Sequence, residues 1–266
     1  MTKFPEISIV MPAYNAASYI VATIESVLLQ TFSNYELLVI NDCSKDNTAD
    51  IVSTYSKHDE RIQLIDLPVN KGAPAGPRNI GIKHSRGKWI AFLDSDDIWH
   101  PMKLQRQMEL MKRTGARFCS TKMLDFVDQS KLKLNDAGAN DYEWITFTQQ
   151  LTKMRTPTSS VLADRELMIN NLFNEDITFK AREDLDCWLH CHEEIGQSIK
   201  ITVPMMGYRI IPGQISGNKW LMVKRHLHVL GKYRYRSGRK LGLMAWFYTF
   251  THFALSIYHR KIRNQL

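Results

Sequence analysis

The N-terminal part of the chain alternates short apolar runs with segments of helical periodicity, and this alternation limits the possible folds more than any other feature. Apolar runs suited to buried strands lie at 7–14, 35–40, 62–67 and 88–93. Segments that favour helices lie between them, at 19–28, 48–55 and 78–85. Strands and helices in this order predict a doubly wound, mostly parallel sheet with its site at the carboxyl ends of the strands.

Length and composition bound the class of protein. A chain of 266 residues, 44% of them hydrophobic, can fill the core of one large α/β domain or of two small ones. Its four cysteines do not form the dense framework of a small secreted domain, so we expect no structural disulfides. The apolar run at 7–11 is too brief for a secretory signal, which favours a protein of the reducing cytosol.

The net charge of +8 is concentrated in the C-terminal part of the chain. Residues 219–266 hold eleven of the 35 Lys and Arg residues and none of the 27 Asp and Glu residues, so the remainder is slightly acidic. Aromatic residues are interleaved with these bases, which favours an anionic membrane surface over nucleic acid. An ordinary solvated, charged helix is the alternative.

A mostly apolar segment at 241–258 has basic residues on both sides. As a helix it would be about 27 Å long, which is borderline for crossing a bilayer. The segment favours a helix lying in the membrane interface with basic anchors at both ends, or equally an ordinary core helix, over a membrane-spanning one.

Three carboxylates stand where the strand expected at 88–93 ends. Asp94, Asp96 and Asp97 would repel one another unless a positive group joins them. Mg²⁺ and Mn²⁺ take oxygen ligands and commonly bridge one or two carboxylates to a diphosphate, so the cluster predicts a metal site for a nucleotide-linked substrate. For Asp97 alone, an N-cap of the helix expected from residue 101 is the alternative.

Five segments in a fixed order resemble the motifs of the family 2 inverting glycosyltransferases of the GT-A fold. They lie at 7–15, 30–32, 41–44, 78–79 and 94–97, and the later sequence Arg182-Glu183-Asp184 is similar to a Glu-Asp motif of that family. The resemblance extends to about residue 217 and does not cover the tail. It implies a nucleotide-binding sheet with an irregular acceptor-side half, followed here by a C-terminal helical tail.

On the side of the nucleotide base, the resemblance implies roles for four residues. Pro12, Ala13 and Tyr14 would line the base, and the Tyr14 ring would stack on its flat face. Asp42 would accept a hydrogen bond from the base ring. Asn41 stands where many relatives have a first Asp, a departure that leaves Asp42 intact.

On the side of the diphosphate, the resemblance implies a cation and a metal site. Arg78 would face the diphosphate, because its guanidinium presents a fork of donors to phosphate oxygens. Asp96 would be the main ligand of Mn²⁺ or Mg²⁺. Asp94 and Ser95 would lie nearer the sugar and ribose of the donor.

An inverting transfer needs a base that takes the proton from the acceptor hydroxyl while the oxygen attacks the anomeric carbon. Asp184 is the candidate, at the start of a helix expected at 183–194, and Asp186 is a competing base. The alternative for such residues is that they only complement the helix dipole.

On this hypothesis the chain divides into a nucleotide-sugar-binding half at 1–101, an acceptor-binding half at 102–217 and a basic, aromatic helical tail at 218–266. The enzyme would move a sugar, by default from a UDP-sugar, to a hydroxyl of a glycan or of a polyprenyl-diphosphate-linked glycan of a surface polysaccharide. It would bind no nucleic acid and lie in the cytoplasm on the inner face of the cell membrane. Two alternatives remain: transfer onto a polyprenyl phosphate, which needs no carboxylate base, and a non-catalytic domain that binds nucleotide or membrane.

Overall fold

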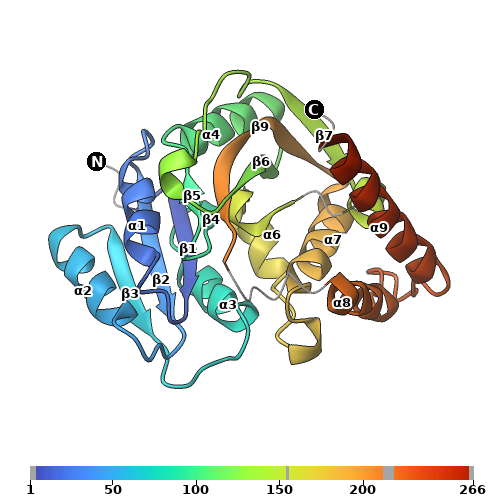
Figure 1. Cartoon of the computed structure of the whole chain (residues 1–266), viewed down its shortest axis with the longest axis horizontal. Coiled ribbons are helices and arrows are strands. Elements are labelled where there is room, and N and C mark those ends of the chain that lie inside the picture. The colour runs from blue at the N-terminus through green and yellow to red at the C-terminus, as the bar shows by residue number, and fades with distance from the viewer. Residues whose placement is uncertain (1–3, 154–155, 212–218, 264–266) are drawn as a thin grey trace.

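The fold is built on one large sheet. The computed structural model describes residues 4–153, 156–211 and 219–263, and over these residues nine strands form the order β3-β2-β1-β4-β8-β6-β9-β5, with β7 paired to β9. The first helices lie at the β3 end of the molecule, and the two C-terminal helices lie at the opposite end (Figure 1). The chain therefore has the α/β architecture expected from its sequence.

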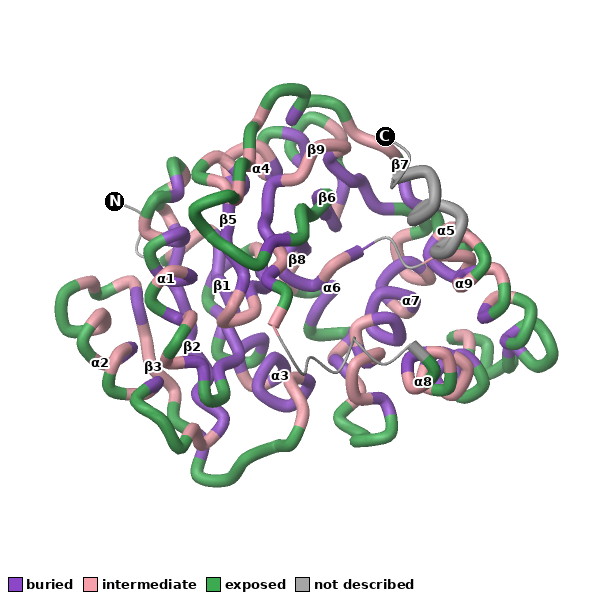
Figure 2. Tube along the Cα trace, in the orientation of Figure 1, coloured by how far each residue is buried: buried purple, intermediate pink, exposed green. Residues whose placement is uncertain are grey.

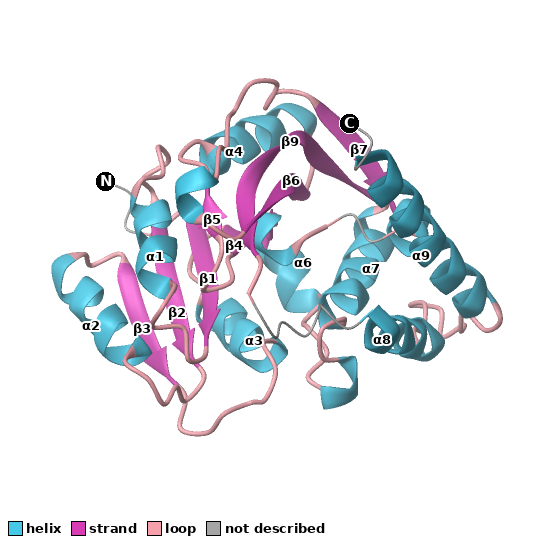
Figure 3. Cartoon of the chain, in the orientation of Figure 1, coloured by secondary structure: helices cyan, strands magenta, loops and turns pink. Residues whose placement is uncertain are grey.

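The first part of the sheet is parallel (Figure 3). Its strands are β1 (Ile7–Ala13), β2 (Tyr35–Asn41), β3 (Ile62–Asp66) and β4 (Trp89–Phe92). They are joined through the helices α1 (Ile20–Leu28), α2 (Thr48–His58) and α3 (Ala75–His84). The predicted alternation is confirmed, with small shifts of the helix ends.

Alternate residues of β1 face opposite layers of helices, as the two-residue period of a strand requires. Ile9 and Met11 belong to a buried cluster with Ile24 of α1, whereas Val10 belongs to a second cluster with Ile82 of α3. Both faces of the sheet are therefore covered, and the carboxyl ends of the strands are left to form a site.

The second part of the sheet is mixed. Its strands are β5 (Ile98–Trp99), β6 (Phe118–Phe126), β7 (Tyr142–Thr146), β8 (Leu162–Asp164) and β9 (Gln197–Arg209). β8 is antiparallel to β4 and β6, and β9 is parallel to β6 but antiparallel to β5 and β7. The sequence predicts one strand here, at 118–126, and this is β6. β5 and β8 are very short and β9 contains Pro204 and Gly207, which obscures their strand pattern.

Four helices and three 3₁₀ turns accompany these strands. The helices are α4 (Lys103–Thr114), α5 (Phe147–Thr152), α6 (Arg165–Asn170) and α7 (Glu183–Ile195). The turns are η1 (Gln129–Lys131), η2 (Thr158–Ser160) and η3 (Ile177–Phe179). The sequence predicts helices from 101 to 114, from 165 to 172 and from 183 to 194, which are α4, α6 and α7. It does not predict α5, whose six residues are too few to show a helical period.

The tail forms two helices, α8 (Lys219–Lys232) and α9 (Met244–Arg263), which pack against α7 and α5 respectively and against each other. Val229 of α8 and Tyr233 just after this helix share a buried cluster with Leu185 and Leu189 of α7. Buried and exposed positions alternate over residues 244–255 of α9 (Figure 2). Its inner face therefore behaves as the core helix that was one of the two expectations for this segment.

The limits of the tail differ slightly from those expected. α9 begins at Met244 rather than at 241, just after Gly242, whose φ of 59° interrupts a helix. The predicted boundary between 217 and 218 lies outside the described residues. Among the helices that are described, none combines the length and the apolar character needed to cross a bilayer.

Gly81 sets how closely α3 approaches β1. A Cβ atom at this position would overlap Cγ1 of Val10 and lie 3.0 Å from its Cγ2, and Val10 is fully buried. We expect Gly81→Ala to lower the free energy of unfolding by about 1–3 kcal/mol, the usual cost of over-packing a core. Urea unfolding followed by circular dichroism measures this change.

Gly231→Ala in α8 is the matched control, because no atom lies within 4 Å of the added Cβ. Alanine is favoured over glycine in a helix by about 1 kcal/mol, so this variant should be neutral or stabilising. Equal losses of stability in the two variants would contradict the close contact.

Candidate active site

The turns that follow β1 and β2 are bonded to each other. The Asn15 backbone N–H donates to Ser44 Oγ over 3.0 Å, and Asn15 Oδ1 accepts from the Lys45 backbone N–H over 2.8 Å. Asn15 and Cys43 have φ angles of 49° and 59°, a left-handed conformation that reverses the chain sharply. The two turns therefore form one rigid rim at this edge of the sheet.

Three residues predicted to line the nucleotide base stand at this rim. Pro12 and Ala13 are buried as the last residues of β1, whereas the following Tyr14 is 51% exposed. An exposed aromatic ring on a fixed turn offers a flat, apolar surface on which a base can stack. The exposure of Tyr14 agrees with the role that the resemblance implies.

Asn41 and Asp42 hold neighbouring loops at the end of β2. Asn41 Nδ2 donates to Asp66 Oδ1 over 2.7 Å, which an Asp at this position could not do. Asp42 is 5% exposed, and its Oδ1 accepts the Lys71 backbone N–H over 2.8 Å. Burial raises the pKa of Asp42, although the Lys71 N–H opposes the shift. The departure at Asn41 is thus explained by the carboxylate of Asp66 beside it.

Arg78 joins the two parts of the chain at the centre of the site. Its Nη2 lies 2.6 Å from Asp94 Oδ1 and its Nη1 lies 3.1 Å from Glu183 Oε1, with 4% of the Arg78 side chain exposed. Burial alone would lower the pKa of Arg78, but the carboxylates of Asp94 and Glu183 raise it above its ordinary value. The guanidinium is therefore a permanent buried cation between β4 and α7.

Backbone hydrogen bonds hold the turn after β4. The Asp94 N–H donates to Ser159 Oγ over 3.0 Å, and the Asp96 carbonyl accepts from Arg209 Nε over 2.8 Å. The carbonyl of the half-buried Ser95 accepts from a side-chain hydroxyl of α1 over 3.0 Å. The turn is thus bonded to α1, η2 and β9, which fixes its carboxylates in place.

Asp97 belongs to this turn and not to a helix start. It is 1% exposed, and its Oδ1 accepts the Arg209 backbone N–H over 3.1 Å. Burial and the neighbouring carboxylates raise its pKa well above the ordinary value. Because α4 begins at Lys103 with Met102 at its N-cap, the alternative in which Asp97 caps this helix is wrong.

Asp96 and Asp94 can supply two of the oxygen ligands of a divalent ion whose remaining ligands come from a substrate. Burial and the charge of Asp94 raise the pKa of Asp96 to about 6, so a cation beside it would relieve the repulsion. Over the described ranges no three His, Cys, Asp or Glu side chains converge as a metal centre. Mg²⁺ is usually held by only one or two carboxylates together with substrate phosphates, which this pair can supply.

Asp184 lies half-buried at the start of α7. Its Oδ2 accepts from Thr158 Oγ1 over 3.4 Å. Burial and the charge of Glu183 raise the pKa of Asp184 to about 6, against the opposing charges of Arg182 and Arg78. At neutral pH this carboxylate is ionised yet more basic than an ordinary Asp, which suits a general base.

Asp186 lies on another face of α7. Its Oδ1 is 3.9 Å from His190 Nε2, and burial raises its pKa. Both side chains line an open hollow of about 370 Å³ with Asn170, Asn171, Leu172, Asn174 and Arg236. None of the residues that line this hollow is an ion-pair partner of Arg78, whose partners are Asp94 and Glu183.

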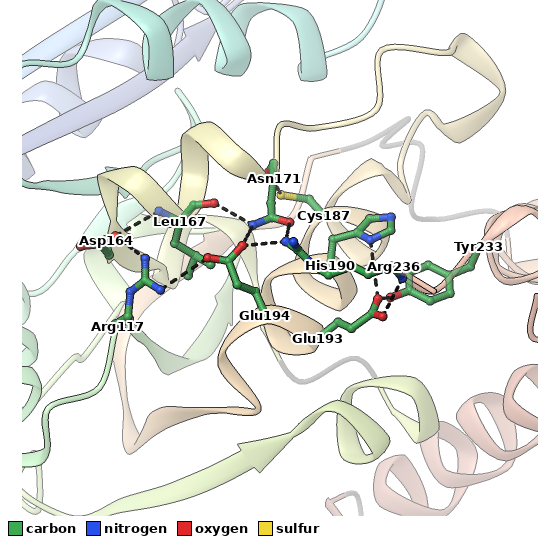
Figure 4. A network of polar contacts seen from close by, with 10 residues as sticks. All are labelled: Arg117, Asp164, Leu167, Asn171, Cys187, His190, Glu193, Glu194, Tyr233 and Arg236. Atoms are coloured by element: carbon green, nitrogen blue, oxygen red, sulfur yellow. Dashed lines mark hydrogen bonds and ion pairs between the residues drawn. The ribbon is translucent and has the colours of Figure 1, made fainter. Parts of the chain in front are cut away.

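A polar network on the same side of α7 connects α6, α7 and the tail (Figure 4). Arg236 Nη2 donates to Asn171 Oδ1 over 2.9 Å and to Glu194 Oε2 over 2.6 Å. The Tyr233 hydroxyl donates to Glu193 Oε2 over 2.8 Å. This side of α7 is occupied with holding the tail, whereas its N-terminal end points to Arg78.

The structure gathers the predicted residues at one edge of the sheet. Tyr14 and Asp42 follow the neighbouring strands β1 and β2, and Asp94 and Asp96 follow β4. Because these strands are parallel neighbours, their carboxyl ends meet at one edge of the sheet. Asp184 is connected to this edge because the preceding residue, Glu183, forms an ion pair with Arg78.

Three supporting residues were not predicted. Glu183 lies in the motif Arg182-Glu183-Asp184, but the resemblance implied no role for it. In the structure it is the buried partner of Arg78. Ser159 and Arg209 bond the acidic turn from η2 and β9. Tyr208-Arg209 resembles a strand of the family, but neither Ser159 nor Arg209 was expected to have a role in the site, because their contacts come from where two distant segments place them.

Comparison with known proteins gives one family. The profile described as "Glycosyl transferase family 2" matches residues 8–171. A Bacillus subtilis protein, TuaG, named as a teichuronic acid biosynthesis glycosyltransferase, is 31% identical over 97% of this chain and 98% of its own. The Escherichia coli protein named "UDP-Glc:alpha-D-GlcNAc-diphosphoundecaprenol beta-1,3-glucosyltransferase WfgD" is 36% identical over 85% of this chain and 86% of its own.

Solved structures share the fold. Staphylococcus aureus TarS 1-349 in complex with UDP-GlcNAc has a TM-score of 0.68 at 19% identity and is matched over 85% of this chain, which spans 65% of the TarS chain. The mannosyltransferase PcManGT from Pyrobaculum calidifontis, in complex with GDP-Man and Mn²⁺, has a TM-score of 0.62 at 16% identity, over 93% and 70% of the two chains. The expected GT-A fold is confirmed.

Removal of the Arg78 charge should destabilise the folded protein. Arg78→Gln leaves the Glu183 carboxylate, 5% exposed, without its ion pair. We expect a loss of about 3–5 kcal/mol in the free energy of unfolding, the usual result of breaking a buried pair. The double variant Arg78→Gln/Glu183→Gln should recover part of this loss, since no buried charge is stranded. Denaturant unfolding measures all three proteins.

Arg106→Gln is the control, because Arg106 pairs with the half-exposed Glu109 and Asp136. Such surface pairs contribute about 0–1 kcal/mol. A double variant no more stable than Arg78→Gln would argue against the buried pair as the cause.

Proposed function

The chain belongs to glycosyl transferase family 2, and on this premise we propose that it is a metal-dependent, inverting enzyme that moves a sugar from a UDP-sugar to a hydroxyl of a lipid-linked glycan in polysaccharide synthesis. The names of relatives support both substrate classes, because WfgD is named for a UDP-Glc donor and a diphosphoundecaprenol-linked acceptor. The TarS complex with UDP-GlcNAc supports the donor class. The observation that carries the proposal is the buried chain Asp94–Arg78–Glu183 beside Asp184.

The donor would bind to the half of the chain at 1–101. Tyr14 would stack on the base above the buried Pro12 and Ala13, and Asp42 would accept a hydrogen bond from it. Arg78 would face the diphosphate, and Asp94 with Ser95 would lie near the sugar. When bound, Mn²⁺ or Mg²⁺ would be held by Asp96 and would supply positive charge against the diphosphate.

The acceptor would bind to the half at 102–217, with Asp184 as the base. The Asp184 carboxylate would take the proton of the acceptor hydroxyl while that oxygen forms a bond to the anomeric carbon. The bond from the anomeric carbon to the diphosphate oxygen breaks on the opposite face, and the nucleoside diphosphate leaves with its electron pair. The pKa of about 6 for Asp184 supports a hydroxyl acceptor, since an ionised phosphate needs no base.

Asp184→Asn should retain UDP binding and lose sugar transfer by about 10²–10⁴-fold, the usual contribution of a general base. The wild-type rate should also fall as the pH drops below about 6, because a protonated Asp184 cannot accept a proton. Single-turnover transfer from UDP-sugars with Mn²⁺ measures the rate, and calorimetry measures UDP binding.

Asp186→Asn is the matched control, an equal change on another face of α7. If it lost transfer while Asp184→Asn kept it, the base would be Asp186.

Asp96→Ala should remove the dependence of UDP binding on Mn²⁺, and an unchanged dependence would refute the metal assignment.

We also propose that α9 lies on a membrane surface. Its outward side and the residue just before it carry large apolar side chains at helical spacing, all more than half exposed: Leu243 before the helix, and Trp246, Phe247 and Phe250 on it. Arg239 and Lys240 are exposed just before the helix. An apolar stripe beside bases favours an interface with anionic lipid. The side chains of the basic residues expected after this segment lie outside the described residues.

Trp246→Ser/Phe250→Ser should weaken binding to vesicles of anionic phospholipid by at least about tenfold, because each buried aromatic side chain contributes about 1.5–3 kcal/mol. Co-sedimentation of the full chain measures binding, and raised salt should weaken it further in both proteins.

Val127→Ser removes another exposed apolar side chain, 74% exposed and remote in sequence from α9, and serves as the control. Equal vesicle binding by the double variant and the control would exclude this face of α9 as the contact.

A further inference from the structure

Two histidines that the proposed mechanism does not use lie between the tail helices. His226 of α8 and His252 of α9 have ring centroids 4.2 Å apart, and they are 0% and 6% exposed. His252 stands on the inner side of α9 with the buried Ala245 and Thr249, opposite the exposed stripe. The pair therefore faces the body of the protein.

The His226 ring is buried without the partners that it needs. Neither Nδ1 nor Nε2 has a hydrogen-bond partner among the residues that the structure describes. Buried polar atoms are nearly always bonded, and an unsatisfied one costs about 1–3 kcal/mol. A fully buried imidazole in this condition points to a ligand that completes it.

The surroundings of the pair are positive. Burial and the charge of Arg182 lower the pKa of His252 to about 3, and Lys153 acts in the same direction. Burial, the neighbouring His252 and Arg182 lower the pKa of His226 to about 2. The charged groups that act on these two rings, Arg182 and Lys153, are thus basic. Such surroundings repel a cation and favour an anion.

The position of the pair relates it to the proposed base. Arg182 immediately precedes Glu183 and Asp184, and its charge acts on Asp184 as well as on both histidines. Arg78 acts on Asp184 too, but it is held by ion pairs with Asp94 and Glu183. An anion at the histidines would therefore lie beside Arg182, which adjoins Glu183 and the proposed base in the sequence.

We propose that His226, His252 and Arg182 bind the phosphate groups of a diphosphate-linked acceptor. The proposal rests on the proposed function and adds the site that selects the acceptor. Neutral imidazoles and a guanidinium donate hydrogen bonds to phosphate oxygens, and the bound anion in turn favours protonation of the rings. Because His252 and the exposed stripe share α9, one helix would connect the membrane surface with this site.

Direct binding tests the site without any turnover. Inorganic pyrophosphate is titrated into the full chain with UDP in excess, and the imidazole C–H signals are followed by NMR. We expect the His226 and His252 signals to shift together, and His226→Gln to weaken pyrophosphate binding at least tenfold. His228→Gln on the same helix, where His228 instead bonds Thr178 Oγ1 over 3.0 Å, should leave the affinity unchanged.

Loss of pyrophosphate binding on addition of UDP, or equal affinities for the His226→Gln and His228→Gln proteins, would overturn the proposal. The wild-type titration decides even if a variant fails to fold, because unshifted histidine signals also overturn it.

A second arm compares two acceptors that carry the same sugar, one as an alkyl diphosphate and one as a phosphate-free alkyl glycoside. His226→Gln should lower the preference for the diphosphate acceptor, measured as a ratio of kcat/KM values, about tenfold, and an unchanged ratio would contradict the site. Absence of transfer to every acceptor would instead count against the proposed function, while the pyrophosphate titration would still decide the site.

Discussion

One buried guanidinium sets the geometry on which the candidate site depends. The side chain of Arg78, in α3, pairs with Asp94 after β4 and with Glu183 at the start of α7. Asp94 and Glu183 are about ninety residues apart in the sequence. A buried charge is tolerated only when it is paired, so these two carboxylates have to stay where they are. The ring of Phe173 covers the guanidinium at 5.3 Å and shields it further. The two parts of the sheet are therefore joined at their functional edge.

The same charge shapes the acidity of the residues around it. Burial raises the pKa values of Asp96 and Asp184 to about 6, and the charge of Arg78 limits both shifts. Two perturbed carboxylates on either side of a fixed cation are typical of a site that handles charge, because an isolated structural pair needs no such balance. This electrostatic arrangement suits the proposed function, since a departing diphosphate and a proton acceptor would need opposite kinds of environment.

The tail packs against the rest of the protein through one side and leaves its other side exposed. Val229 and Tyr233 share a core with α7, and Arg236 bonds Asn171 and Glu194 (Figure 4). The outer side of α9 is left apolar and exposed, which a soluble surface rarely tolerates over a continuous stripe. The sequence left an interfacial helix and a core helix as equal alternatives. The structure shows the core face, and the exposed apolar face is the one proposed to contact a membrane.

The sequence by itself determined the alternating strands and helices, the acidic turn after β4 and the basic charge of the tail, because periodicity, strand ends and composition are local properties. It also placed Arg78 and Asp184 in motifs. Only the tertiary structure decided that Glu183 pairs with Arg78, that Arg209 bonds Asp97 and that the rings of His226 and His252 lie beside each other. Short strands such as β8 form because neighbours supply their hydrogen bonds, and buried charges find partners wherever packing brings them. These outcomes depend on contacts between distant segments, which no local pattern encodes.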